Sequence, residues 1–166
     1  TRSGETLGQD IVLRFSSAPR APMYSVGAPS QVAMYDANRA PNMSVALVNV
    51  QQVDFRLSTM APADLLPFLG RDAYQQFERY QPPANRQVRA WSARQTPKLN
   101  ETTVITTTLT ERGNLAPGAY FLNVSSPQAR SNMGSQRDAR YVLLVSDTNL
   151  MLKRTDREAL VWATSL

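Results

Sequence analysis

Short apolar stretches alternate with polar positions along most of the chain, and turn residues separate them. Residues 53–57, Val-Asp-Phe-Arg-Leu, have the period of two that is typical of a strand with one buried face. Further stretches rich in β-branched, aromatic and aliphatic residues predict strands at residues 11–15, 31–35, 43–50, 88–94, 101–110, 120–124 and 141–145. The pattern therefore predicts an all-β fold of short strands.

Residues 62–80 are the part of the chain with helical signals. Pro62 suits the first turn of a helix, and Asp64 lies near the N-terminal end, where a negative charge is favourable. Gly70 can end a first short helix, and Pro82-Pro83 ends a second. We expect a small helical insertion of two pieces within the β domain.

Tyr74, Phe77 and Tyr80 recur at three-residue spacing and therefore lie near one face of the second helix. Such an aromatic stripe can bind a partner, or it can pack on the sheet of its own domain. We expect the second arrangement, because an aromatic stripe at helical spacing usually belongs to a core.

Prolines at positions 19, 22 and 29 follow the first predicted strand. Proline fixes its own φ angle and disfavours helix in the residue before it, so this stretch predicts an extended linker. A module boundary near residue 18 follows from this reading.

About seven short strands with one helical insertion predict an antiparallel β-sandwich of the immunoglobulin or fibronectin type III kind. Leu115, Pro117, Gly118 and Tyr120 form a Pro-Gly turn that leads into a late strand, as in the tyrosine corner of Greek-key sandwiches. Pro117 sets the first turn position, Gly118 accepts a positive φ, and the Tyr120 phenol can bond back to the main chain. We expect Tyr120 to be structural.

Length and composition fit one soluble domain, or one domain with fragments of its neighbours. The chain has 166 residues, 42% of them hydrophobic, and at this size about two thirds of the unfolded surface can be buried. It shows no signal-peptide pattern and no apolar run long enough to enter a membrane. Because it opens on Thr1 and closes on the apolar stretch 160–166, we expect it to be a piece of a longer protein.

The chain contains neither histidine nor cysteine. This excludes Ser-His-Asp and Cys-His nucleophilic sites, zinc sites with imidazole or thiolate ligands, haem or iron-sulfur ligation, and disulfides. Catalysis would have to use carboxylate, lysine or tyrosine side chains.

The formal charge of +5 arises from 18 basic and 13 acidic residues that are spread along the chain. Only the stretch from Arg86 to Arg94, around Trp91, approaches the basic and aromatic pattern of a nucleic-acid surface. Alternating arginine and apolar residues also describe a half-buried strand. We expect the strand, and no nucleic-acid partner.

Two acidic pairs are candidates for general acid and base chemistry, Asp54 with Glu101 and Asp147 with Asp156. The sequence does not show that either pair converges across a cleft, as glycosidase chemistry requires. A calcium site from Asp147, Asn149 and Asp156 lacks the regular spacing of known calcium loops. We therefore expect no catalytic residue, no metal and no cofactor.

An adhesin or carbohydrate-binding sandwich is the alternative function, because sugars stack on exposed aromatic rings. Trp91 and Trp162 are the candidate rings, although both lie in strand-like stretches that favour core or interface positions. The Thr-rich stretch 101–110 lacks the regular repeat of an ice-binding face. Burial of the two tryptophans decides between these readings.

Several segments in order resemble macroglobulin-like domains of bacterial alpha-2-macroglobulin family proteins. These are residues 115–122 (Leu-Ala-Pro-Gly-Ala-Tyr-Phe-Leu), residues 141–150 (Tyr-Val-Leu-Leu-Val-Ser-Asp-Thr-Asn-Leu), Lys153, and residues 160–164 (Leu-Val-Trp-Ala-Thr). In that family a strand ends one domain, a short Leu-x-Leu-Lys strand opens the next, and an apolar strand with Trp follows.

The N-terminal part is similar too: residues 11–17 resemble the closing strand of a preceding module, and residues 45–57 the hairpin before the family's helical insertion. The resemblance covers roughly residues 10–166. It implies a closing strand or linker at 1–17, a macroglobulin-like sandwich at 18–147 with its insertion at 62–80, and the opening strands of a following domain at 148–166.

Proteins of this family trap peptidases: cleavage of a bait segment triggers a rearrangement, and many members carry a thioester formed by cysteine. A chain without cysteine has no thioester, and the polar loop at 127–139 is exposed enough to be cut without being a recognised bait. The resemblance implies a non-catalytic scaffold in the periplasm, at the cell surface or secreted. Its implied partners are neighbouring domains and, through the full-length protein, peptidases, with Leu150, Leu152 and Trp162 as possible domain-interface residues.

Overall fold

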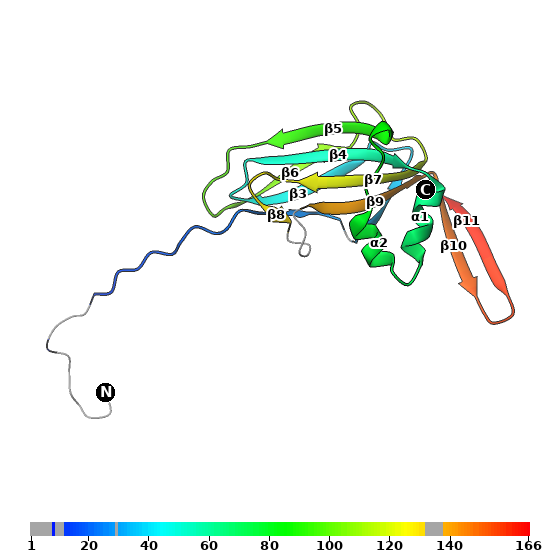
Figure 1. The fold of residues 1–166 in the computed structure, drawn as a ribbon, viewed down its shortest axis with the longest axis horizontal. Coiled ribbons are helices and arrows are strands. Elements are labelled where there is room, and N and C mark those ends of the chain that lie inside the picture. Colours follow the sequence, from blue (N-terminus) through cyan, green and yellow to red (C-terminus); the bar gives the residue numbers. More distant parts are fainter. Residues whose placement is uncertain (1–7, 9–11, 29, 132–137) are drawn as a thin grey trace, which may run out of the picture.

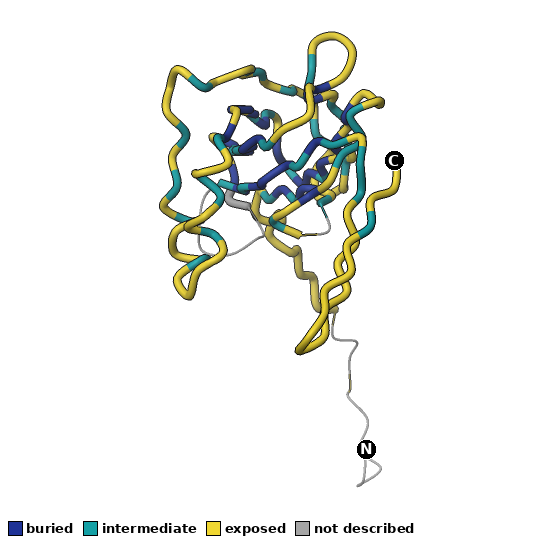
Figure 2. Tube along the Cα trace, turned by 90° about the vertical axis from the view of Figure 1, so that its right-hand side faces the viewer, coloured by how far each residue is buried: buried dark blue, intermediate teal, exposed yellow. Residues whose placement is uncertain are grey.

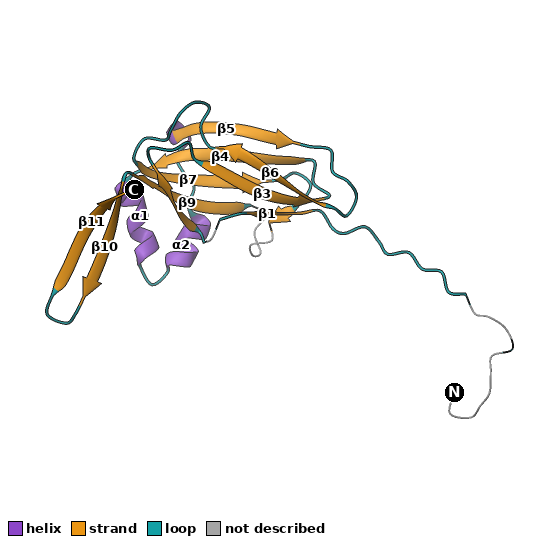
Figure 3. Ribbon diagram, turned by 180° about the vertical axis from the view of Figure 1, so that it is seen from behind, coloured by secondary structure: helices purple, strands orange, loops and turns teal. Residues whose placement is uncertain are grey.

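The computed structural model describes residue 8 and residues 12–28, 30–131 and 138–166. Within these residues the strands form two layers and a separate hairpin (Figure 1). The layers face each other as a β-sandwich, as the alternating pattern predicts. Figure 3 shows the same arrangement from behind, with the helices against one layer and the hairpin projecting beyond the sandwich.

The first layer is a five-stranded sheet in the order β2-β9-β7-β4-β5. Its strands are β2 (Val32–Asp36), β4 (Gln52–Met60), β5 (Gln87–Arg94), β7 (Gly118–Ser125) and β9 (Ala139–Ser146). Neighbouring strands are antiparallel except for β2 and β9, which run parallel. The predicted strands at 31–35, 53–57, 88–94, 120–124 and 141–145 all lie in this sheet.

The second layer is a four-stranded sheet in the order β6-β3-β1-β8. Its strands are β1 (Met23–Val26), β3 (Asn42–Val48), β6 (Thr102–Thr108) and β8 (Arg130–Ser131). The linker prediction was wrong over β1, because Pro22 stands just before this strand, where it removes no ladder hydrogen bond. The described part of the predicted loop 127–139 contains β8, and residues 132–137 lie outside the described residues.

The core lies between the two layers, where alternate residues of each strand point inward. Tyr24, Val45, Leu57, Leu122 and Leu143 are among the fully buried side chains. The Tyr24 hydroxyl donates to the Val124 carbonyl (2.8 Å) and accepts from the Ala139 N–H (3.3 Å), so this phenol in one sheet hydrogen-bonds to two strands of the other.

A ring stack lies on the side where β5 approaches β6. Trp91 stacks on Phe55 with ring centroids 4.9 Å apart, and the Arg89 guanidinium lies 4.3 Å from the Trp91 ring centroid. The Trp91 indole N–H donates to Thr107 Oγ1 (2.9 Å), and Arg89 donates to the Thr108 carbonyl (2.7 Å). These bonds join the two sheets at this side.

The helical insertion covers part of the outer face of the five-stranded sheet (Figure 3). It comprises α1 (Pro62–Leu65), the 3₁₀ turn η1 (Leu66–Leu69) and α2 (Ala73–Arg79), and a further turn η2 (Ala84–Arg86) leads into β5. Phe77 is buried against Phe121 of β7, and Tyr80 also packs on Phe121. Tyr74 is exposed, so two of the three predicted aromatic positions pack on the domain's own sheet.

Asp64 holds the insertion together. Its carboxylate accepts from the Ala61 N–H (2.9 Å) and the Tyr80 hydroxyl (3.2 Å), and it pairs with Arg86. The Ala61 hydrogen bond, with smaller contributions from Tyr80 and Arg86, holds the Asp64 pKa below its ordinary value despite partial burial. Burial and the nearby Asp64 charge raise the Tyr80 pKa.

The described part of the predicted strand at 11–15 is not a strand. Residues 12–22 run as an extended segment without ladder partners, and Val12, Leu13 and Phe15 are exposed (Figure 1). Strand-forming composition does not suffice here, because no neighbouring strand supplies the hydrogen bonds.

Among the described residues, none of the helices reaches the length and apolar character that a membrane span requires.

Candidate interaction surface

The hairpin of β10 (Thr148–Arg154) and β11 (Ala159–Ser165) begins one residue after β9. The Ser146 hydroxyl donates to the Thr148 carbonyl (2.8 Å) and accepts from the Thr148 N–H (3.0 Å). The Leu166 N–H donates to the Asp147 carbonyl (2.9 Å), and the Ala37 N–H donates to the Ser146 carbonyl (2.9 Å). These bonds fix the base of the hairpin at the end of the sandwich.

The opposite end of the hairpin is a polar turn. The Thr155 N–H donates to the Glu158 carbonyl (2.8 Å), and Thr155 Oγ1 accepts from the N–H groups of Glu158 (3.0 Å) and Arg157 (3.3 Å). Local side-chain hydrogen bonds of this type stabilise turns. The hairpin is therefore closed at its tip and anchored at its base.

Both faces of the hairpin carry large apolar side chains. Side chains of paired residues share a face, and successive residues alternate between faces. One face carries Leu150, Leu152, Val161 and Ala163, and the other carries Met151, Leu160 and Trp162.

Most of these side chains are open to solvent. Leu150 and Leu152 are 68% and 65% exposed, and Trp162 is half-buried with the Lys153 ammonium 5.6 Å from its ring centroid. The two buried apolar clusters of the described residues contain no hairpin side chain, and Figure 2 shows the hairpin exposed along most of its length. The structure thus places the three residues predicted for a domain interface on one hairpin, with Leu150 and Leu152 on one face and Trp162 on the other. We call the two faces together the hairpin surface.

The Pro-Gly turn lies at the start of β7. The Tyr120 hydroxyl donates to the Ala116 carbonyl (2.8 Å), Leu115 is buried, and Gly118 has a φ of +154°. Partial burial of the phenol raises the Tyr120 pKa. This arrangement ties the turn to the strand it precedes.

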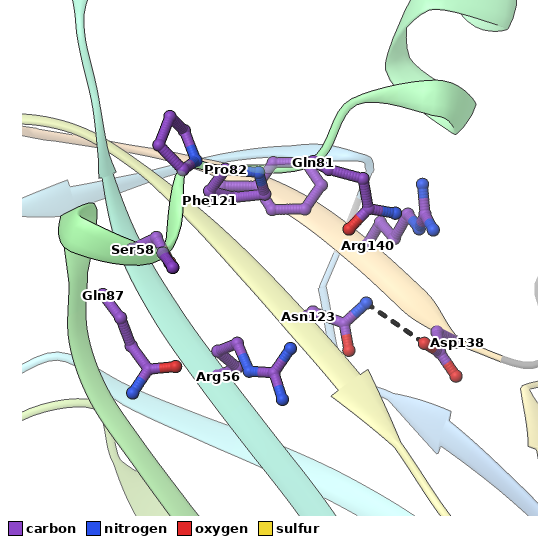
Figure 4. A pocket seen from close by; sticks show the side chains of 11 residues that line it. Arg56, Ser58, Gln81, Pro82, Gln87, Phe121, Asn123, Asp138 and Arg140 are labelled. Carbon is purple, nitrogen blue, oxygen red and sulfur yellow. Dashed lines mark hydrogen bonds between the residues drawn. The ribbon is translucent and has the colours of Figure 1, made fainter.

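A polar groove crosses the outer face of the five-stranded sheet (Figure 4). Arg56, Asn123 and Arg140 stand in one row on β4, β7 and β9, beside a cavity of about 340 Å³. Asn123 Nδ2 donates to Asp138 Oδ2 (3.3 Å), and Arg140 donates to the Glu78 carbonyl of α2. The sequence did not reveal this row, because it depends on the pairing register of three strands that are far apart along the chain.

The structure does not bring Asp54 and Glu101 into one site. Asp54 lies on β4, where Oδ1 accepts from Gln52 Nε2 (2.8 Å) and Ser92 Oγ (2.5 Å). Glu101 precedes β6 in the other sheet and pairs with Lys98 at 3.7 Å. The hydrogen bonds of Asp54 come from its own sheet, so its nearest partners are structural.

The other predicted acidic set is spread along the hairpin. Asp147 precedes β10 and Asp156 follows it, and a strand of seven residues spans about 23 Å. Asp147 and Asn149 lie at the base while Asp156 lies at the tip, so the proposed calcium ligands do not gather. Within the described residues there is no group of three or more acidic side chains that could hold a metal ion.

Trp91 is engaged within the sandwich by Phe55, Arg89 and Thr107, as described above. A sugar-binding platform needs an uncovered ring face, and Trp91 does not pair with Trp162, which lies on the separate hairpin. The arginines flanking Trp91 are also engaged: Arg86 pairs with Asp64, and Arg94 donates to Gln52 (3.0 Å).

No model of a known protein family matches the chain, and no curated protein matches it by sequence. Its fold does match solved structures. The two-layer sandwich with its helical insertion has the same fold as parts of two solved fragments of a macroglobulin.

The likeness is to native alpha-2-macroglobulin from Escherichia coli. A crystal structure spanning domains MG0-NIE-MG1 superimposes with a TM-score of 0.60 at 16% identity, over 89% of this chain and 46% of that chain. A second, spanning NIE-MG1, gives 0.56 at 13% identity, over 87% of this chain and 70% of that chain. The chain thus spans less than half of the first fragment, and at these identities the likeness establishes the fold.

Proposed function

We propose that the chain is a non-catalytic scaffold and interaction module of a bacterial alpha-2-macroglobulin-like peptidase inhibitor. Residues 18–147 form the macroglobulin-like sandwich, residues 1–17 are a linker or the closing strand of a preceding module, and residues 148–166 open the next. The module acts in the periplasm, at the cell surface or in the secreted fraction.

The observation that carries this proposal is the hairpin surface. Large apolar side chains on both faces of a two-stranded ribbon are unfavourable in water, and an isolated hairpin is marginally stable at best. Leu150, Leu152 and Trp162 therefore lie where a neighbouring module can cover them. The fold likeness to fragments that span several domains supports this arrangement.

The anchored base gives the module a mechanical role. The hydrogen bonds around Ser146 and Asp147 hold the hairpin to the end of β9, so a module that grows on the hairpin is positioned by this sandwich. We expect sandwich modules joined by a large apolar contact of this kind to move together, so that a change of shape passes from one to the next. The proposed role in trapping is thus the placement and coupling of neighbours, with no reaction on this chain.

The test compares this chain with a longer parent chain that contains it and its neighbours. Each is incubated with a peptidase and separated by size, and the peptidase in the high-mass fraction is measured. We expect the parent to retain the peptidase and this chain to retain none. Retention by this chain alone would contradict the scaffold role.

A substitution pair isolates the hairpin surface. Leu152→Asp in the parent places a charge where a neighbouring module is expected, so retention should fall at least tenfold. Leu69→Asp changes an 81% exposed leucine of the helical insertion and should leave retention unchanged. Equal retention by both variants would remove the hairpin from the proposed mechanism.

A further inference from the structure

The extended segment at residues 12–22 is hydrogen-bonded to the sandwich at one residue. Every side chain of this segment is exposed, Phe15 by 95%, so apolar burial does not hold it in place. Among the described residues, its hydrogen bonds to the sandwich are those of the Arg20 main chain. The segment then continues into β1, which begins at Met23. The direction of residues 12–20 is therefore set at Arg20.

Two asparagines, Asn49 and Asn100, hold both main-chain polar groups of Arg20. Asn100 Oδ1 accepts from the Arg20 N–H (2.8 Å), and Asn49 Nδ2 donates to the Arg20 carbonyl (2.7 Å). The same asparagines also bond to each other: the Asn100 N–H donates to Asn49 Oδ1 (2.7 Å), and Asn49 Nδ2 donates to Asn100 Oδ1 (3.2 Å). Each amide thus fixes the other in the position that holds Arg20.

The main chain is left-handed at both asparagines, with φ of +55° at Asn49 and +65° at Asn100. In the part of the chain that the structure describes, no other residue besides glycine has a positive φ. Asparagine tolerates this region better than most side chains. Val48 pairs with both Met23 and Thr102, so the two asparagines lie where β3 ends and where β1 and β6 begin. Figure 1 shows the segment leaving the sandwich here, at the end opposite the hairpin.

We propose that Asn49 and Asn100 form a latch, which holds residues 12–20 in one direction and releases them as a unit while the sandwich stays folded. Each exposed hydrogen bond contributes little net free energy, and segments without buried contacts open locally. Opening stops at β1, because Tyr24 is buried in the core. The segment thus has a latched and a free state. This inference concerns this chain alone and does not rest on the proposed function.

Trypsin measures the free state, because it cleaves after arginine and binds the main chain around the cleaved bond. Arg20 must leave the latch before cleavage. The Arg14 main chain has no hydrogen bond to another described residue and serves as the internal reference. Mass spectrometry of the purified 166-residue chain gives the initial rates at which peptides ending at Arg14 and at Arg20 appear. The ratio of these rates is compared between variants, so that the intrinsic preferences of trypsin cancel.

Glycine substitutions remove the latch amides without straining the turns, because glycine accepts a positive φ. Asn49→Gly and Asn100→Gly should each raise relative cleavage after Arg20 about tenfold, since each removes more than one of the coupled bonds. The double variant should exceed the stronger single variant by no more than about twofold, as for one cooperative unit. Asn114→Gly changes an exposed asparagine before β7 and is the control with an unchanged ratio.

Amide hydrogen exchange of the wild-type chain gives a test that needs no variant. Relative to intrinsic rates, the Arg20 amide should exchange about tenfold or more slowly than the Ala18 amide, which has no partner among the described residues. It should also exchange about tenfold or more quickly than the Ser25 amide of β1, which pairs with Ala46. Thermal unfolding checks that the glycine variants keep the sandwich.

Three results would overturn the inference. Exchange at Arg20 as fast as at Ala18 would show that no latch forms, and exchange as slow as at Ser25 would show that the segment is released only when the sandwich unfolds. A cleavage ratio that is unchanged in both glycine variants, or effects that multiply in the double variant, would remove the two asparagines as one latch. Peptidase retention by the parent is not among these measurements, so the latch and the scaffold function fail independently.

Discussion

Strands β9 and β10 follow each other with one residue between them, yet they have opposite environments. Leu143 on β9 is fully buried between the sheets, whereas Leu152 on β10 is 65% exposed. Both strands are rich in aliphatic residues. The difference is the number of neighbours: β9 lies between β2 and β7 under a second sheet, and β10 has β11 alone. A hydrophobic sequence thus identifies a strand whose side chains favour burial, but the neighbouring strands and sheets determine whether they are buried.

The sharpest test of this contrast replaces one leucine in each strand. Leu143→Ala should lower the free energy of unfolding by about 2–5 kcal/mol, because it opens a cavity in a closed core. Leu152→Ala should change it by less than about 0.5 kcal/mol in dilute protein, as at other exposed positions. Urea unfolding measures both, and similar losses would mean that the hairpin is part of the cooperative core.

The Tyr24 phenol tests how the two sheets are joined. Tyr24→Phe leaves the Val124 carbonyl and the Ala139 N–H without this partner in a buried place, so we expect a loss of about 1–3 kcal/mol. Tyr35→Phe, which removes a long 3.4 Å bond at a less buried site, is the matched control and should cost much less. The comparison fails if the two variants unfold at the same urea concentration.

The Pro-Gly turn should have an intermediate effect. Tyr120→Phe removes the 2.8 Å hydrogen bond to Ala116 at a partly buried site, with an expected loss of about 1 kcal/mol. Tyr74→Phe changes an exposed phenol and should be neutral. Thermal unfolding of the pair measures the difference, and a neutral Tyr120→Phe would argue against the predicted structural role of the phenol.

Acid should weaken the helical insertion through Asp64. Its folded pKa is below the ordinary value, so its stabilising effect is present above the unfolded pKa of about 4 and is lost as the pH falls through the lower folded pKa. Asp64→Asn should flatten the fall of unfolding free energy below about pH 4, and Tyr80→Phe should flatten it less. Parallel pH curves for wild type and Asp64→Asn would contradict this origin.

Much of the sandwich could be predicted from the sequence, because its strands alternate on a period that burial imposes. Strand β4 shows this best, since Val53, Phe55 and Leu57 are all buried as the pattern requires. Strand β1 was missed because the flanking prolines suggested a linker, and β8 has only two residues. At residues 12–15 the error was the reverse, because a strand was predicted where none is found. The local pattern is strand-like, but no neighbouring strand pairs with it.

The candidate surface was only partly predictable. Leu150, Leu152 and Trp162 were identified as interface candidates, but their placement on opposite faces follows from the register of β10 with β11. The row of Arg56, Asn123 and Arg140 could not be found, because nothing in the local sequence reports which residues stand side by side on three distant strands. A single sequence does not report the pairing register of its strands, and that register determines which side chains become neighbours.

The hairpin is joined to the sandwich through the single residue Asp147. A small rotation at this junction is therefore amplified into a larger displacement of the hairpin tip. The ribbon is about 23 Å long beyond this junction, so a rotation of about 10° at its base carries the tip by about 4 Å. A slight repacking of the strand ends under Ser146 therefore becomes a displacement comparable to the spacing between strands. A neighbouring module bound to the hairpin would therefore change its position when the sandwich changes its shape.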